Sequence, residues 1–112
     1  VMEFVIGYAN ERQAFGEPIS YRQAVAFMIA DMGIEIEAMR LLTWRAVSRA
    51  EQGKPFQRET HLARTLCKEK AMKIGTDGVQ LLGGHGFTKE YPVERWYRNL
   101  RAIGVAFGGL HL

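Results

Sequence analysis

The spacing of apolar side chains along the chain limits its possible folds more than any other feature. Apolar residues recur at intervals of three and four positions through most of the sequence, and no useful stretch alternates between apolar and polar residues. The first pattern places apolar side chains on one face of an α-helix, whereas the second is typical of a half-buried strand. The sequence therefore predicts an all-α fold, an antiparallel four-helix bundle with short connections.

Glycine and proline residues mark where the predicted helices end. The helices are expected at about residues 1–13, 21–52 and 58–82, and from near Pro92 to a gradual end between Gly104 and Gly109. Gly16 with Pro18 separates the first two segments, Gly53 with Pro55 the next two, and the run Gly83–Gly86 the last two. Glycine frees the backbone and proline cannot continue a helix, so these positions are natural breaks.

The second helix is expected to begin with a capping box, in which Ser20 and Gln23 each bind an exposed backbone N–H. Its apolar positions form two stripes instead of one. The first stripe consists of Val25, Met28, Met32, Ile36, Met39, Leu42 and Ala46, and the second of Phe27, Ala30, Ile34, Ala38 and Leu41. A helix that is apolar over more than one face is covered on more than one side. Either the bundle or a second subunit must supply that cover, and we expect the chain to self-associate.

Length and composition indicate one ordinary globular domain. The chain has 112 residues, of which 47% are hydrophobic and 24% charged, enough to bury a core without a metal or disulfide. No apolar stretch approaches the length of a membrane span, and the start lacks the pattern of a secretory signal. Basic and acidic residues are interleaved, so the net charge of +3 gives little reason to expect a nucleic-acid partner.

The first residue and the single cysteine allow two further predictions, one about the extent of the chain and one about its redox environment. Val1 lies inside an apolar pattern with no capping residue before it, so we expect the chain to be part of a longer protein. Cys67 has no partner for an intrachain disulfide, which favours a reducing compartment. Because Cys67 lies on the apolar stripe of the third helix, we interpret it as a small core residue.

Residue combinations typical of catalytic or metal sites are missing from the sequence. Ser20 and Ser48 are the only serines, and neither lies in a nucleophile elbow. The three histidines are too dispersed to suggest a metal site. Glu35 and Glu37 are two positions apart on a helix, so they point in different directions and are interpreted as solvated charges.

Two segments contain groups suited to binding a phosphate or a flat ring. The first, ERQAFGEPI at residues 11–19 with Gln23 beyond it, places Arg12 at a helix end beside an aromatic residue and a glycine turn. The second, TDGVQLLGGHGF at residues 76–87, places a glutamine before a cluster of glycines. Arginine supplies a planar, permanently charged fork for phosphate, and glycine lets backbone amides approach an anion or a ring closely.

These two segments resemble the signatures of the acyl-CoA dehydrogenase family, in its C-terminal helical domain. The matching positions are Arg12, Phe15, Gly16, Ile19 and Gln23 in the first segment, and Asp77, Gln80, Gly83, Gly84, Gly86, Phe87, the run EYPVER at 90–95 and Arg98 in the second. The family's domain is a four-helix bundle that builds a dimer or tetramer and closes one side of an FAD site. The resemblance implies FAD as cofactor, an acyl-CoA substrate and electron-transferring flavoprotein as electron acceptor. It also implies the cytoplasm in a bacterium or the mitochondrial matrix in a eukaryote.

The resemblance also implies roles for individual residues. The implied cofactor-binding positions are Arg12, Phe15, Gln23, Gln80, Gly83 and Gly84. Arg12 would contact the FAD pyrophosphate, Phe15 would pack near the adenosine half, and Gln23 would reach the same region. Gln80 and the backbone of the two glycines would meet the FAD of an adjoining subunit.

Each of these residues also has a simpler structural interpretation. Arg12 would be a charge favoured by the helix dipole at a C-terminus. Phe15 would be an apolar residue that closes the bundle, and Gln23 the capping partner of Ser20. The paired glycines would only end a helix.

The resemblance fails at the catalytic base. The family commonly has a glutamate just after the last helix, and the corresponding residue here is Phe107, which cannot accept a proton. No catalytic residue is therefore expected in this chain. Some members, the isovaleryl and long-chain types, carry the base on the helix that opens the domain, at a position that would precede Val1. Three hypotheses follow: the intact protein uses that upstream carboxylate, it is a non-catalytic homologue or subunit, or it has another flavin-linked role.

Overall fold

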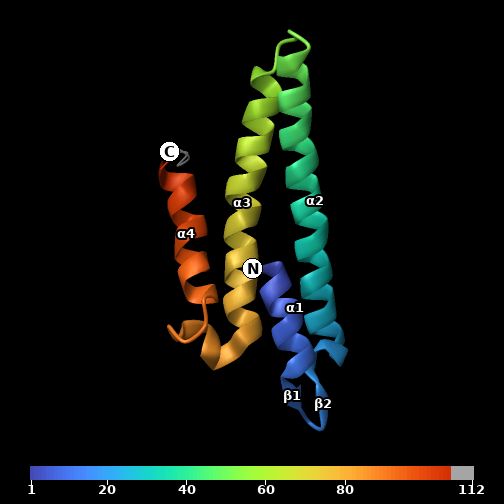
Figure 1. Cartoon of the computed structure of the whole chain (residues 1–112), viewed down its shortest axis with the longest axis vertical. Helices are drawn as coiled ribbons and strands as arrows, with labels where there is room; N and C mark the ends of the chain where they lie inside the picture. Colours follow the sequence, from blue (N-terminus) through green and yellow to red (C-terminus); the bar gives the residue numbers. More distant parts are fainter. Residues whose placement is uncertain (107–112) are drawn as a thin grey trace.

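The computed structural model describes residues 1–106, and four α-helices account for most of them (Figure 1). They are α1 (Met2–Glu11), α2 (Gln23–Glu51), α3 (Gln57–Leu82) and α4 (Val93–Ala106). Two short antiparallel strands, β1 (Gln13–Ala14) and β2 (Glu17–Pro18), and the 3-10 turn η1 (Ile19–Tyr21) connect α1 to α2. A second 3-10 turn, η2 (Gly83–Phe87), follows α3. The predicted all-α antiparallel bundle is confirmed, with helix ends close to the expected positions.

The long helices α2 and α3 form a hairpin to which the shorter helices are added at one end. Figure 1 shows α1 and α4 beside the lower part of this hairpin, with α1 antiparallel to α2 and α4 antiparallel to α3, while the upper part of α2 and α3 extends beyond them. The molecule is consequently elongated, with extents of 56 × 25 × 21 Å. The core lies at the end where all four helices meet. It consists of Val5, Ala9, Met32, Ile74, Leu81, Leu82 and Val93.

The small residues of α3 allow this close packing. A Cβ atom added to Gly78 would lie 2.8 Å from Val1 Cγ1 and 3.3 Å from Val93 Cγ1, so a larger residue there would force these side chains to shift. The predicted apolar stripe of α3 accordingly faces its neighbours. Cys67 differs from the prediction, because it is half-buried at the wall of a cavity of about 260 Å³ between α3 and α4, instead of inside the core.

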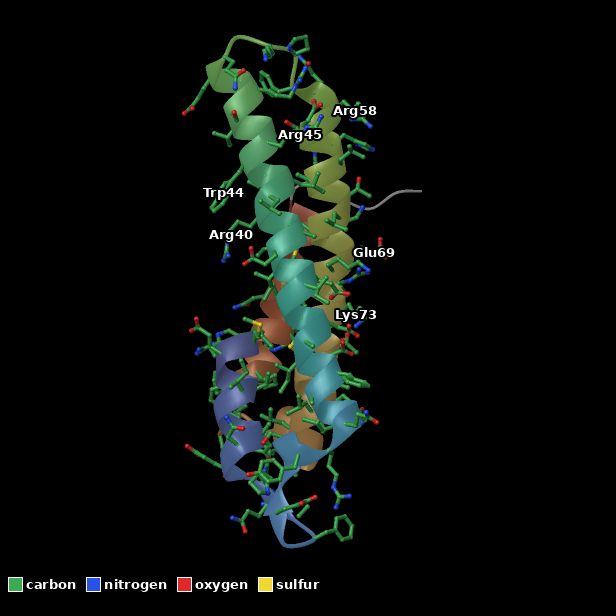
Figure 2. All side chains as sticks on the ribbon, turned by 90° about the vertical axis from the view of Figure 1, so that its right-hand side faces the viewer. Arg40, Trp44, Arg45, Arg58, Glu69 and Lys73 are labelled. Carbon is green, nitrogen blue, oxygen red and sulfur yellow. The ribbon has the colours of Figure 1, made fainter. Side chains whose placement is uncertain are left out.

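The two predicted stripes of α2 have different environments. Met32, from the first stripe, is completely buried in the core. Phe27, Ile34 and Leu41, from the second stripe, expose 60%, 67% and 59% of their surface. Figure 2 shows Arg40 and Trp44 projecting outward from the same helix. The first stripe is therefore covered by the bundle, and residues 1–106 of one chain leave the second stripe uncovered.

The capping box predicted at the start of α2 is wrong. Ser20 lies inside the turn η1, and the residue that precedes the helix is Arg22, with extended backbone (φ −73°, ψ 128°) and no side-chain cap. The helix begins at Gln23, so this glutamine is its first residue and not its third. The predicted cap residue lies two positions before the residue that precedes the helix, because Ser20 belongs to the 3-10 turn, and the box therefore cannot form.

Glu35 also differs from its prediction as a solvated charge. Only 14% of its side chain is exposed, and Oε1 lies 3.6 Å from Nζ of Lys70 and 3.9 Å from Nζ of Lys73 on α3. Lys73 donates a hydrogen bond of 2.7 Å to Asp77, and this bond raises the pKa of Lys73 above its ordinary value. Glu37 is exposed as predicted and pairs with Arg40 on its own helix. Glu35 is drawn inward because α3 places two lysines opposite it.

Two further features concern the described residues as a whole. No helix within residues 1–106 is both long and apolar enough to cross a membrane. In the same residues, no group of three or more histidine, cysteine, aspartate or glutamate side chains is arranged to hold a metal ion.

Candidate functional site at the end of the bundle

The two sequence segments singled out above meet at the lower end of the bundle in Figure 1. The end of α1 and the β1–β2 hairpin carry the first segment, and the end of α3 with η2 carries the second. Arg12 ends α1 in an extended conformation (φ −72°, ψ 124°). Its N–H donates to the Tyr8 carbonyl (2.8 Å), and its carbonyl accepts from the N–H of Ile19 (2.8 Å). These bonds fix the backbone of Arg12 between helix and turn.

A cleft of about 390 Å³ joins the two segments. It is lined by Tyr8, Arg12, Ile19, Leu81, Leu82, Gly83, Gly84 and His85. A second cleft of about 530 Å³ is lined by Phe4, Gly7, Tyr8, Glu11, Arg12, His85 and Tyr91. Tyr8, Arg12 and His85 contribute to both, so the two clefts adjoin along these three side chains. The structure thus brings Arg12 together with Gly83 and Gly84, although more than 70 positions separate Arg12 from these glycines in the sequence.

The glycine backbone in the cleft is uncovered. Gly83 ends α3 with a positive φ of 60°, which explains glycine at that position without any ligand. At both Gly83 and Gly84, however, a Cβ atom would have no other heavy atom within 4 Å. Gly86 is different, because a Cβ there would overlap the backbone of Val79. Packing therefore requires glycine at position 86. At position 84, neither packing nor backbone conformation requires a glycine.

The Arg12 side chain is exposed and contributes to the lining of both clefts. Within residues 1–106, its guanidinium group has no ion pair or hydrogen bond. A solvent-facing guanidinium beside an open stretch of backbone suits an anionic ligand, because arginine presents a rigid fork of donors to phosphate or carboxylate oxygens. The donor set and the open glycine backbone fit a dinucleotide such as FAD.

The remaining predicted positions, Phe15, Gln23 and Gln80, are not among the residues that line either cleft. Phe15 is at the tip of the hairpin with 92% of its surface exposed and a positive φ of 55°, and the guanidinium of Arg22 lies 4.9 Å from its ring centre. It does not close the bundle, so that alternative interpretation is wrong. Gln23 is exposed in the first turn of α2, and Gln80 is exposed in the last turn of α3. Phe107 lies outside the described residues.

Sequence reasoning missed an aromatic group in the cleft. The Tyr8 hydroxyl lies 3.0 Å from Nδ1 of His85, and the His85 ring stacks on Tyr91 with centroids 5.1 Å apart. The sequence motifs do not single out Tyr8, and His85 stands out only as one of three dispersed histidines. The available signal was spacing, because Tyr8 precedes Arg12 by one helical turn and therefore lies on the same side of α1.

Fold and cleft together define a helical domain with an open cleft, lined by Arg12 and two glycines, at one end of its bundle. The chain belongs to the acyl-CoA dehydrogenase family, because residues 1–109 match the family model described as "Acyl-CoA dehydrogenase, C-terminal domain". The resemblance inferred from the two motifs is confirmed.

Similar proteins support this membership along almost the whole chain. The mitochondrial short-chain specific acyl-CoA dehydrogenase of Bos taurus is 42% identical over 107 residues, covering 96% of this chain and 26% of that protein. A probable acyl-CoA dehydrogenase of Mycobacterium bovis is 43% identical over 108 residues, covering 96% of this chain and 28% of that protein. Among solved structures, butyryl-CoA dehydrogenase from Megasphaera elsdenii superposes with a TM-score of 0.90 at 34% identity, covering 93% of this chain and 27% of that one. An FAD complex of PigA superposes with a TM-score of 0.89 at 30% identity, covering 93% and 27%.

Proposed function

We propose that this chain is the FAD-contacting and oligomerising C-terminal domain of an acyl-CoA dehydrogenase that forms the α,β-double bond of acyl-CoA thioesters. The chain spans about a quarter of the length of the curated relatives it matches. The observation that carries the proposal is the shared cleft, in which Arg12 and the open backbone at Gly83 and Gly84 meet. The family membership and the FAD complex of a structural neighbour support the choice of ligand.

The residues of this chain would bind and orient the cofactor. FAD, when bound, supplies the acceptor for the hydride that leaves the β-carbon of the acyl chain. Arg12 would pair with the pyrophosphate, and the glycine backbone would let the dinucleotide approach the end of α3. Because these groups line one cleft of one chain, they would serve the same FAD molecule. The family resemblance implies the FAD of an adjoining subunit for the glycines, and the shared cleft supports one common ligand for Arg12 and the glycines.

Proton abstraction is assigned to a residue other than Phe107. A general base must reach the α-proton within about 2.6–3.2 Å, directly or through one water, and must have a lone pair to accept it. A phenylalanine side chain has none, so we propose that a carboxylate on another part of the complete protein is the base. Electron-transferring flavoprotein would reoxidise the flavin, in the bacterial cytoplasm or the mitochondrial matrix.

The exposed stripe of α2 supports the oligomerising part of the proposal. Phe27, Ile34 and Leu41 repeat every seven residues on that helix and are each more than half exposed. A row with this spacing fits a second helix that carries the same pattern. We propose that another copy of this domain covers the stripe.

The proposal is tested by replacing Arg12 with alanine in the complete protein and measuring FAD affinity of the apoprotein by flavin fluorescence. Loss of a charge-assisted contact worth about 1.5–3 kcal/mol lowers affinity by roughly tenfold to a hundredfold. Arg58→Ala is the matched control, because Arg58 lies at the opposite end of the molecule (Figure 2). Unchanged FAD retention by Arg12→Ala would remove Arg12 from the site. A protein that binds FAD but oxidises no acyl-CoA would instead support the alternative, a non-catalytic assembly domain or subunit.

A further inference from the structure

The Tyr8 hydroxyl is a hydrogen-bond partner of one ring nitrogen of His85. The Tyr8 hydroxyl lies 3.0 Å from Nδ1 of His85 and 3.4 Å from the carbonyl oxygen of Leu82. When the hydroxyl donates to Nδ1, the imidazole is neutral and its proton is on Nε2. In the reverse arrangement Nδ1–H would donate to the Tyr8 oxygen, and the tyrosine proton would be left with the Leu82 carbonyl, the more distant of the two contacts.

The same pair also accommodates a protonated histidine. An imidazolium donates from both nitrogens, so Nδ1–H would donate to the Tyr8 oxygen. The tyrosine proton would then turn to the Leu82 carbonyl, which lies within reach. In both of these arrangements Tyr8 satisfies Nδ1 while Nε2 keeps an N–H. Stacking of the ring on Tyr91 (28° between planes) further limits its orientation.

His85 and Arg12 line both clefts at the end of the bundle. We infer that His85, oriented by Tyr8, is a second donor to the anionic part of the bound dinucleotide beside Arg12. His85 would touch the ligand through Nε2–H, and Tyr8 would be a positioning residue that acts through His85. This inference rests on the proposed FAD site, and it adds two residues that the family motifs did not assign.

The competing role for this group is a stacking platform for the adenine ring. Tyr8, His85 and Tyr91 form a compact aromatic cluster, and such clusters bind flat bases without any hydrogen bond. The two roles differ in the ligand fragment that each recognises. A donor to phosphate distinguishes ADP from adenosine, whereas a stacking platform binds the adenine of both equally.

The experiment uses the apoprotein of the complete protein and the variants His85→Phe, Tyr8→Phe and the double variant. Affinities for FAD are measured by fluorescence, and those for ADP and adenosine by competition. We expect His85→Phe to weaken FAD binding roughly tenfold to a hundredfold and to weaken ADP binding but not adenosine binding. Tyr8→Phe should have a smaller effect, and the double variant should bind no more weakly than His85→Phe, because Tyr8 acts through His85.

A readout without ligand tests the positioning role directly. The ¹⁵N chemical shifts of His85 at neutral pH should show one fixed tautomer in the wild-type protein, and Tyr8→Phe should remove this preference. If His85→Phe prevents folding, His85→Asn and Tyr8→Phe replace it in the titrations.

Equal weakening of ADP and adenosine binding in His85→Phe would overturn the inference in favour of stacking. Unchanged FAD affinity in His85→Phe, with weakened affinity in Arg12→Ala, would overturn the inference and leave the proposed site intact. Unchanged affinity in both would overturn the proposed site itself.

Discussion

Gly86 lies against the backbone of Val79 so closely that a Cβ atom at Gly86 would overlap the Val79 carbonyl oxygen. This contact folds the turn η2 back onto the last turns of α3 and so fixes the wall of the cleft. Gly84, two residues earlier, has open space where its Cβ would be. The glycines of one short turn therefore serve different purposes.

Gly86→Ala is expected to destabilise the fold. The overlapping atoms belong to the backbone and cannot rotate away, so the turn must shift, at a cost of about 1–3 kcal/mol. Chemical denaturation followed by far-UV circular dichroism measures the change. A Gly86→Ala protein as stable as the wild type would show that the turn does not pack on Val79 as closely as described.

Gly84→Ala is expected to leave stability within about 0.5 kcal/mol of the wild type, as for a typical surface substitution. Its added methyl group projects into open space, so it should instead weaken FAD binding in the complete protein. Flavin titration of the apoprotein measures this effect. Gly83→Ala is a poorer test, because the positive φ of Gly83 strains any other residue. Normal FAD affinity in Gly84→Ala would mean that the cofactor does not approach this backbone.

The sequence was informative where local spacing decides the structure, and less so where distant elements meet. Apolar periodicity and glycine–proline breaks predicted the helices, because both act within a few residues. The environment of Glu35 was not predictable, since it depends on lysines 35 and 38 positions away on α3. The hydrogen bond between Tyr8 and His85 was not predictable for the same reason, because the two residues are 77 positions apart in the sequence. The failed cap at Ser20 had a local cause, a 3-10 turn that the helix pattern did not reveal.

Lys73 gives the fold an alkaline pH dependence. Its pKa is raised above 10.5, chiefly by the hydrogen bond to Asp77, so folding stabilises the protonated lysine. The contribution is fully present below that ordinary value and is lost as the pH rises through the higher pKa of the folded state. Because 44% of the side chain is exposed, we expect an effect of less than about 1 kcal/mol. Thermal unfolding between pH 9 and 12 should show a shallower decline for Lys73→Met; an identical decline would argue against this origin.

Met32→Ala is expected to be among the most destabilising substitutions in α2. Met32 is completely buried where the four helices meet, and removal of a buried methionine side chain costs about 2–5 kcal/mol. Ile34→Ala is the matched control, because Ile34 also carries a large apolar side chain but exposes 67% of its surface. Urea unfolding of the two variants at low protein concentration separates the core contribution from any effect on association. Equal losses of stability would contradict the assignment of the two stripes to different environments.

Ile34→Glu is expected to weaken self-association without unfolding the helices. In the proposed dimer, the exposed stripe of α2 would be covered by a second copy, and a carboxylate placed there would be buried without a partner. We expect at least about a tenfold loss in association constant, which corresponds to roughly 1.4 kcal/mol. Asn99→Glu, an equal change of charge at an exposed position of α4, is the control and should associate as the wild type does. Sedimentation velocity at micromolar concentrations measures the dimer fraction, and circular dichroism confirms the helix content. A wild-type chain that sediments as a monomer, or an Ile34→Glu chain that associates normally, would show that this stripe is not the interface.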